Sequence, residues 1–177
     1  MNLTRIDSPD AAAVQHVADA LTLLPYLPPR PHRLADAGSG GGVPGIPLAI
    51  VRPDVRVTLI EATGKKARFL EQTARELRLT NIQVVNARLE DAAGLREAFD
   101  VVVARALAPM DKLARWCLPL VRLGGALLAM KGPRAHGELA GAARTIARLG
   151  GRPAVLHPVD EPNLDGHIIA EVRKAAI

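Results

Sequence analysis

A glycine-rich stretch, DAGSGGG from Asp36 to Gly42, is the first candidate for chemistry in this chain. Glycines at this density give up side-chain packing and lose much backbone entropy on ordering, so we expect a ligand to approach the main chain there. The stretch follows a short apolar run and precedes Pro44, a residue type favoured at the first position of a helix. Open α/β sheets bind ligands at such strand-to-helix loops. Glycine loops also serve as tight connectors, so a second feature is needed.

Glu61 supplies that second feature, because it ends another apolar run, LIEA, about twenty residues beyond the glycine loop. A carboxylate at this position accepts hydrogen bonds from both hydroxyls of a ribose, which indicates a nucleotide-type cofactor. A dinucleotide would call for Gly-x-Gly-x-x-Gly, yet the sixth position counted from Gly38 is Val43. S-adenosylmethionine has no phosphate but carries an ammonium group, which Asp36 could meet directly or through water. We therefore favour S-adenosylmethionine and methyl transfer over hydride transfer.

Polar residues also follow the next three predicted strands and would lie at the same edge of the sheet. In ARLED, the Leu89 backbone and the Glu90 carboxylate are candidates to accept the adenine amine, although Glu90 could instead cap a short helix. Arg105 follows an apolar run and precedes the small residues of ALAP, which favours a clamp for a carboxylate or phosphate. The cations expected around this edge predict an anionic substrate, and they are Lys65, Arg88, Arg105 and Lys131. We assign no histidine to catalysis and expect no metal site.

Short β-branched runs alternate with segments of helical period, which is typical of a parallel sheet built from βα units. We expect strands at Arg33–Ala37, Val55–Ala62, Ile82–Ala87, Phe99–Ala104, Ala126–Lys131, Ala154–Val159 and His167–Lys174. The helices expected between them span Pro44–Val51, Lys65–Leu79, Lys112–Leu120 and Gly137–Leu149. The segment DEPNLDG leaves no room for a crossover helix, so the last two strands must form an antiparallel hairpin. The predicted fold is α/β, with a seven-stranded, mostly parallel sheet of the class I methyltransferase, Rossmann-like type.

The length of 177 residues and the hydrophobic content of 49% suit one domain with a core of its own. We expect an N-terminal helical segment and linker over residues 1–32, with Ser8 as the N-cap and Pro9 at the first helical position. Residues 33–177 would then form the cofactor-binding domain.

Charge and composition narrow the classes of partner. The formal charge of +5 and the high sequence pI of about 10.0 make a polyanionic partner plausible. A genomic bias toward arginine codons explains this basic composition equally well. Aromatic residues make up only 2%, which argues against a stacking platform for single-stranded nucleic acid. The single cysteine, Cys117, lies in an apolar segment, so we expect no disulfide framework and a reducing, cytoplasmic environment. We expect neither a signal peptide nor a membrane anchor.

Several longer motifs together resemble the bacterial RsmG/GidB methyltransferases, and the likeness extends through nearly the whole chain. The motifs are NLTRIDSP, DAGSGGGVPGIPLAIVRP, LIEATGKKARFL, LRLTNIQVVNARLED, FDVVVARALA and AMKG. The resemblance implies methylation of guanine N7 in the decoding-region loop of 16S rRNA, with S-adenosylmethionine as methyl donor. It also implies 16S rRNA or the small ribosomal subunit as the partner of a cytoplasmic monomer. A small-molecule methyltransferase with the same cofactor is the alternative function.

The resemblance also implies a set of site residues. The cofactor contacts would be Gly38, Gly40, Val43, Glu61, Ala62, Thr63, Leu89, Glu90 and Arg105. We expect Lys65, Arg88 and Lys131 to hold RNA phosphates, and Arg105 to orient the cofactor or the incoming nucleotide. The exposed lone pair of guanine N7 can attack a sulfonium methyl without prior loss of a proton, so we expect no catalytic base. Family members carry a further helical segment before NLT, so we expect a shortened N-terminal segment here. They also carry an Arg beside the His of the last strand, which this sequence lacks.

Overall fold

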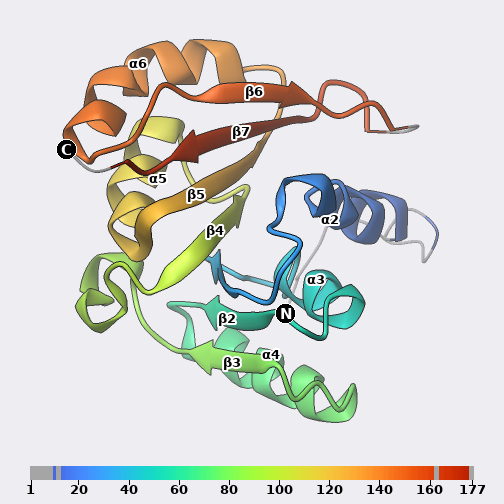
Figure 1. The fold of residues 1–177 in the computed structure, drawn as a ribbon. Coiled ribbons are helices and arrows are strands. Elements are labelled where there is room, and N and C mark those ends of the chain that lie inside the picture. The colour runs from blue at the N-terminus through green and yellow to red at the C-terminus, as the bar shows by residue number, and fades with distance from the viewer. Residues whose placement is uncertain (1–9, 11–12, 162–163, 176–177) are drawn as a thin grey trace.

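A seven-stranded sheet forms the centre of the molecule in the computed structural model, which describes residues 10, 13–161 and 164–175 (Figure 1). The strand order across the sheet is β3-β2-β1-β4-β5-β7-β6. The strands are β1 Arg33–Ala37, β2 Arg56–Ile60, β3 Ile82–Val85, β4 Phe99–Arg105, β5 Val121–Lys131, β6 Val155–Pro158 and β7 Ile168–Arg173. All the predicted strands are thus confirmed. β5 begins at Val121 rather than Ala126, because a register shift beside Gly124 lets this glycine-containing segment pair with Phe99.

The pairing of the strands places a crevice at one edge of the sheet. β1 pairs in parallel with both β2 and β4, and the parallel ladder continues to β3 and β5. β7 runs antiparallel to β5 and β6, which confirms the hairpin expected from the short connection. The chain winds outward in opposite directions from β1 and β4, and open α/β sheets bind ligands beyond the carboxyl ends of strands at such a switch point.

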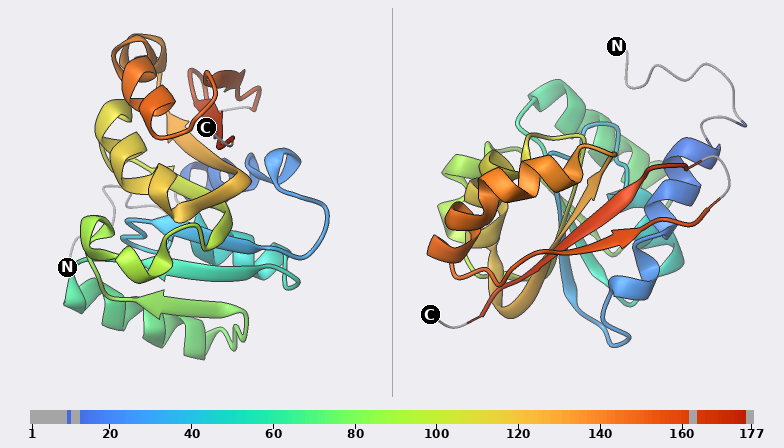
Figure 2. Two further views of the ribbon diagram at one scale, coloured as in Figure 1. Left: turned by 60° about the vertical axis from the view of Figure 1, so that its left-hand side comes forward. Right: turned by 90° about the horizontal axis from the view of Figure 1, so that it is seen from above.

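Helices cover both faces of the sheet (Figure 2). They are α2 Asp19–Leu21, α3 Gly45–Val51, α4 Gly64–Glu76, α5 Met110–Cys117 and α6 Ala135–Arg148. Alternate side chains of β4 point to opposite faces, as expected for a strand buried on both sides. Val102 shares a core with Leu113 of α5, whereas Val101 shares the other core with Leu48 of α3 and Leu70 of α4. The four predicted helices are confirmed, although the third ends in a 3-10 turn over Leu118–Leu120.

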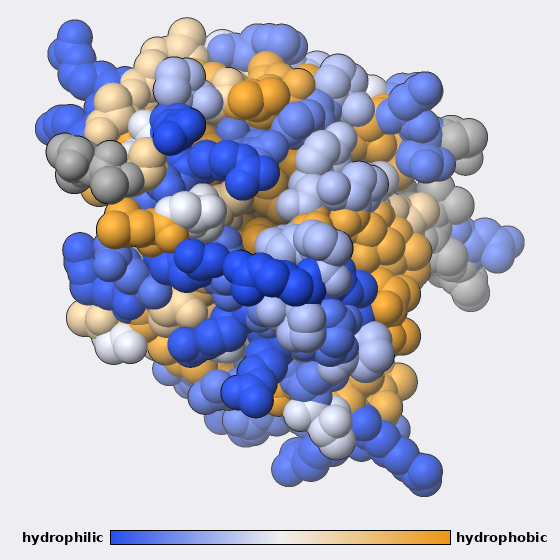
Figure 3. All heavy atoms as spheres, in the orientation of Figure 1, coloured by the Kyte–Doolittle hydropathy of each residue, from blue (hydrophilic) through white to orange (hydrophobic). Residues whose placement is uncertain are grey.

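The N-terminal segment packs against the sheet face that α3 covers. A π-helical segment, Ala13–Ala18, leads into α2, and a 3-10 turn follows at Leu24–Tyr26. Leu23 and Leu27 are buried in the same core as α3. Figure 3 shows an apolar area over α2 and α3 on an otherwise largely hydrophilic surface. The exposed apolar side chains in or near these helices are Val17, Ile50 and Val51. The predicted cap at Ser8 and Pro9 lies outside the described residues.

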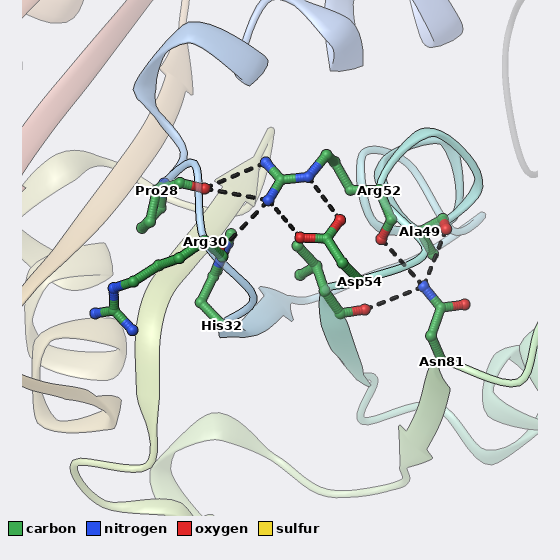
Figure 4. Close-up of polar contacts among 8 residues, drawn as sticks. Pro28, Arg30, His32, Ala49, Arg52, Asp54 and Asn81 are labelled. Carbon is green, nitrogen blue, oxygen red and sulfur yellow. Dashed lines mark hydrogen bonds and ion pairs between the residues drawn. The ribbon is translucent and has the colours of Figure 1, made fainter.

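Polar contacts connect the segments at the amino end of the sheet (Figure 4). The Arg52 guanidinium donates to both carboxylate oxygens of Asp54, at 2.8 and 2.7 Å, and to the Pro28 carbonyl oxygen at 3.2 Å. The Asn81 amide nitrogen donates to the carbonyl oxygens of Ala49 and Val55, each at 3.0 Å. These bonds fix the linker before β1 and the turn between α3 and β2. The segments that enter the strands are therefore held at the end of the sheet opposite the crevice.

Asp36 lies beneath the glycine loop at the end of β1. It is 1% exposed, and its Oδ2 accepts a hydrogen bond of 3.0 Å from the backbone N–H of Gly45, the first residue of α3. The hydroxyl of Ser39 donates to the Asp36 carbonyl oxygen at 2.9 Å. Burial raises the pKa of the Asp36 carboxyl to about 7, and the hydrogen bond from Gly45 offsets only part of this effect. The carboxyl thus fastens the strand to the helix.

We predict that Asp36 lowers the free energy of unfolding as the pH rises from about 4 to about 7. In this window the unfolded chain has released the proton and the native state retains it, so the native state loses stability with rising pH. Below about pH 4 both states bind the proton, and the contribution no longer changes. In urea unfolding across this range, the free energy of unfolding of Asp36→Asn relative to that of the unsubstituted protein should rise with pH.

The matched control is Asp54→Asn, which replaces an exposed carboxylate at the opposite end of the sheet. It should keep the pH dependence of the unsubstituted protein between about pH 4 and 7. Equal slopes for Asp36→Asn and the unsubstituted protein would contradict the assignment.

Candidate active site

The glycine loop turns sharply between β1 and α3. Gly38 has a φ of +71°, a backbone conformation that favours glycine. A Cβ added at Gly38 would lie 2.5 Å from Cδ1 of Leu107, which lies in the segment after β4. The conformation of Gly38 therefore favours glycine, and a side chain there would also displace Leu107.

Glu61 is held rigidly at the end of β2. Its Oε2 accepts a 2.9 Å hydrogen bond from the backbone N–H of Gly40, and its Oε1 accepts one of 2.8 Å from Thr63. The side-chain amide of Asn86 donates to the Glu61 carbonyl oxygen at 2.8 Å. Each carboxylate oxygen keeps a second lone pair, so both can also accept from a ligand hydroxyl. The carboxylate is thus fixed and ready to bind a diol.

A cavity of about 420 Å³ lies beside the glycine loop, a volume within the range of small-molecule sites. Its lining includes most residues predicted to bind the cofactor: Gly38, Gly40, Val43, Glu61, Ala62, Leu89, Glu90 and Arg105. Thr63 does not line the cavity, but its backbone holds Glu61 and it precedes α4 as N-cap. The structure therefore brings together residues from the ends of β1, β2, β3 and β4.

Asp36 does not line this cavity, so its side chain is not placed for direct contact with a ligand ammonium. The reason is its hydrogen bond to Gly45, which turns the carboxyl toward α3. Of the two expected routes, directly or through water, the direct one does not fit this arrangement.

The predicted cations lie in three different settings. Arg88 is exposed and lines the cavity, whereas Lys65 is exposed on α4 and its neighbour Lys66 lines the cavity instead. Lys131 is mostly buried, and its Nζ donates to the Ala108 carbonyl oxygen and pairs with Glu138, each at 2.7 Å. The Lys131 charge is therefore compensated within the fold, while Arg88 and Lys65 face solvent.

The lining residues that were not predicted include Ala106, Leu107 and Trp116. Ala106 has a φ of +51°, an uncommon conformation for a residue with a side chain, which redirects the chain after β4. Trp116 belongs to α5, and the ammonium of Lys112 lies 5.0 Å from its ring centroid. The small residues of ALAP are the one sequence signal for this part of the wall, while Trp116 reaches it only through the packing of α5.

Arg105 separates the first cavity from a second one of about 590 Å³. Arg105, Ala106 and Leu107 line both cavities, so the two are adjacent. The Arg105 guanidinium donates to Asp19 Oδ2 at 3.3 Å, and its Nη2 lies 2.8 Å from Nδ1 of His16. Such an arrangement can hold a ribose-bearing ligand on one side of Arg105 and a second reactant on the other.

Among the described residues, no helix has the length and apolar character needed to cross a membrane.

Solved structures with a similar fold are methyltransferases. A putative S-adenosyl-L-methionine-dependent methyltransferase from Methanococcus maripaludis superposes with a TM-score of 0.73 at 13% identity, covering 95% of this chain and 91% of that one. The geranyl diphosphate C-methyltransferase of Streptomyces coelicolor A3(2) gives a TM-score of 0.67 at 16% identity, covering 89% of this chain and 79% of that one. At these identities the likeness establishes the class I methyltransferase fold.

Sequence comparison identifies closer relatives. A protein of Roseiflexus sp. (strain RS-1) named ribosomal RNA small subunit methyltransferase G is 40% identical over 99% of this chain, which covers 76% of that protein. A protein of the same name from Sorangium cellulosum (strain So ce56) is 49% identical over 84% of this chain and 64% of its own length. The GidB family model, described as rRNA small subunit methyltransferase G, matches residues 1–167. The chain therefore belongs to the GidB family.

Proposed function

We propose that this protein transfers the methyl group of S-adenosylmethionine to N7 of a guanine in the decoding-region loop of 16S rRNA. Family membership supports methylation of small-subunit rRNA, because the relatives are named for it. The observation in the structure that carries the proposal is the Glu61 carboxylate, fixed beside the glycine loop in a cavity of suitable volume. The choice of guanine N7 and of the decoding region rests on the family resemblance of the sequence motifs.

The first cavity fits S-adenosylmethionine. The Glu61 oxygens can accept hydrogen bonds from the two ribose hydroxyls while they keep Gly40 and Thr63 in place. Gly38 gives the ligand access to the main chain, since no Cβ covers the backbone at that point. Leu89 and Glu90, in the 3-10 turn Leu89–Asp91 that follows β3, are the proposed acceptors for the adenine amine. None of these contacts requires a phosphate group on the ligand.

The proposed reaction requires the protein to align the reactants and does not require a catalytic base. S-adenosylmethionine supplies an electrophilic methyl group on a sulfonium sulfur. The N7 lone pair is free in neutral guanine, so no side chain has to remove a proton before methyl transfer. The residues of the site have to align the two reactants and exclude water, and alignment alone can contribute about 7 to 11 kcal/mol. Arg105 and Leu107, which line both cavities, are placed at the boundary where this alignment would be set.

We further propose that exposed cations near the cavity hold RNA phosphates. Arg88 and Lys65 fit this role because they face solvent near the cavity and at the start of α4. Lys131 is better suited to hold the segment after β4, through the Ala108 carbonyl oxygen, than to bind a phosphate directly. In this proposal residues 33–177 bind the cofactor and residues 1–32 complete the site of a cytoplasmic monomer.

The proposal predicts a specific defect for Glu61→Gln. The substitution removes the charge that strengthens hydrogen bonds from the ribose, so the affinity for S-adenosylmethionine should fall about 10- to 100-fold. Trp116, the single tryptophan of the chain, lines the cavity and reports binding by its fluorescence.

Glu71→Gln is the matched control, because Glu71 is exposed on α4 and does not line the cavity. It should bind as the unsubstituted protein does. Equal affinities of Glu61→Gln and Glu71→Gln would argue against the ribose contact.

Mass mapping of methylated rRNA tests the proposed reaction. The protein is incubated with S-adenosylmethionine and either protein-free 16S rRNA or intact small subunits. We expect a single added methyl at N7 of a guanine in the decoding-region loop. A methyl at another position would refute the N7 assignment, and no methylation of either RNA would refute the proposed function.

Salt dependence separates an RNA substrate from a small molecule in the same assay. Phosphate contacts by Lys65 and Arg88 should make the logarithm of affinity for subunits fall with log salt, and their joint replacement by Ala should reduce the slope by about 1.5. Arg144→Ala, at an exposed position of α6, is the control that should keep the slope. A slope unaffected by the double substitution would contradict these phosphate contacts.

A further inference from the structure

A buried carboxylate joins three segments of the chain at the second cavity. Asp19 of the N-terminal segment is 3% exposed. Its Oδ2 accepts from Nη1 of Arg105 at 3.3 Å, and its Oδ1 lies 3.0 Å from Nδ1 of His167. Arg105 ends β4, whereas His167 immediately precedes β7. In Figures 1 and 2, α2 lies beside the end of the hairpin from which β7 starts.

The hydrogen bonds of Asp19 determine what its partners present to the cavity. An ionised carboxylate can only accept, so Nδ1 of His167 carries the proton in this pair. In the neutral ring Nε2 is then an acceptor, and within the described part of the chain it has no protein partner. The His167 side chain is 36% exposed and lines the cavity, so Nε2 can meet a ligand. Arg105, in contrast, can only donate.

The walls of the second cavity suit a purine nucleotide. Leu107, Leu113 and Met130 provide apolar surface for the flat face of a base. Guanine offers an acceptor at O6 and N–H donors on its amine and ring, which match the Arg105 donors and the Nε2 acceptor of His167. Because the cavity adjoins the first one at Arg105, a base bound here would lie next to the cofactor site.

Stability alone does not account for this carboxylate. Replacing a buried ion pair with well-packed apolar residues is often neutral or stabilising, so the pair is weak support for a purely structural role. A leucine at position 19 could anchor the helix to the core as Leu23 does. The carboxylate, in contrast, orients a guanidinium and an imidazole that both line the cavity.

We infer that Asp19 is a positioning residue for methyl transfer, which orients Arg105 and His167 around the acceptor guanine in the second cavity. The inference rests on the proposed function. It makes the N-terminal helix part of the active site, because the acceptor pocket is complete only when this helix is docked. A role limited to anchoring the helix is the alternative, and it predicts loss of stability without a specific loss of turnover.

Steady-state kinetics on small subunits separate the two roles. Asp19→Asn should lower kcat by about 100-fold, since a displacement of about 1 Å in the reacting geometry has this effect. The KM for subunits should stay within about threefold, because Asp19 makes none of the proposed phosphate contacts. The affinity for S-adenosylmethionine should fall much less than kcat, because Asp19 acts on the first cavity only through Arg105. His167→Gln, at a more exposed position, is the second variant and should lower kcat in the same direction.

Asp100→Asn is the matched control. Asp100 is also a mostly buried carboxylate that bridges arginines, with Oδ1 2.8 Å from Nε of Arg122, but it lies near the amino end of β4. It should lower the melting temperature without a specific loss of kcat. The double variant Asp19→Asn/His167→Gln should lose little more kcat than Asp19→Asn alone, because the two residues act together.

The outcomes distinguish the inference from the proposed function. Methylation by the unsubstituted protein, with kcat of Asp19→Asn within about threefold of it, would overturn the inference alone. Equal loss of kcat in Asp19→Asn and Asp100→Asn would assign the effect to stability and overturn it as well. No methylation by the unsubstituted protein would overturn the proposed function and the inference together.

Discussion

The hydrogen bonds that Gly40 and Thr63 donate to Glu61 join the ends of two neighbouring strands, and the candidate site depends on them. They hold the glycine loop over the end of β2 and keep the carboxylate at the cavity wall. Beneath the same loop, Asp36 fastens β1 to α3 through Gly45. One carboxylate therefore lines the cavity, while the other lies outside it and supports the loop. The parallel sheet makes this division possible because its strands end at one edge.

Arg105 connects segments at the end of β4, as Glu61 does at the end of β2. It ends β4, lines both cavities and is held by Asp19 from the N-terminal segment. The second cavity also depends on the antiparallel hairpin, since His167 precedes β7 and completes the pair with Asp19. Asp19, before β1, and His167, before β7, thus meet at one cavity. In the proposed function the central strands would supply the cofactor side of the site, and the segments around Asp19 and His167 would supply the acceptor side.

The strands, the hairpin and much of the lining of the first cavity could be predicted from the sequence, because their signals are local. Glu61 follows its strand directly, and the short DEPNLDG connection allows only a hairpin. The setting of Lys131 could not be predicted, because its charge is compensated by Glu138, which reaches it only through the packing of α6 beside the end of β5. Asp19, assigned no role from the sequence, lies 86 residues from Arg105 and 148 from His167 along the chain. Contacts of this kind arise only when distant segments pack together.

The central claim is that the cavity between the glycine loop and Glu61 is built for a sulfonium nucleoside and not for a dinucleotide. Val43 in place of a further glycine supports this distinction. Calorimetric titration of the protein with S-adenosylmethionine and, in parallel, with NAD tests it most directly. The account predicts one S-adenosylmethionine bound per chain and no heat of binding for NAD. Binding of NAD in preference to S-adenosylmethionine would contradict it.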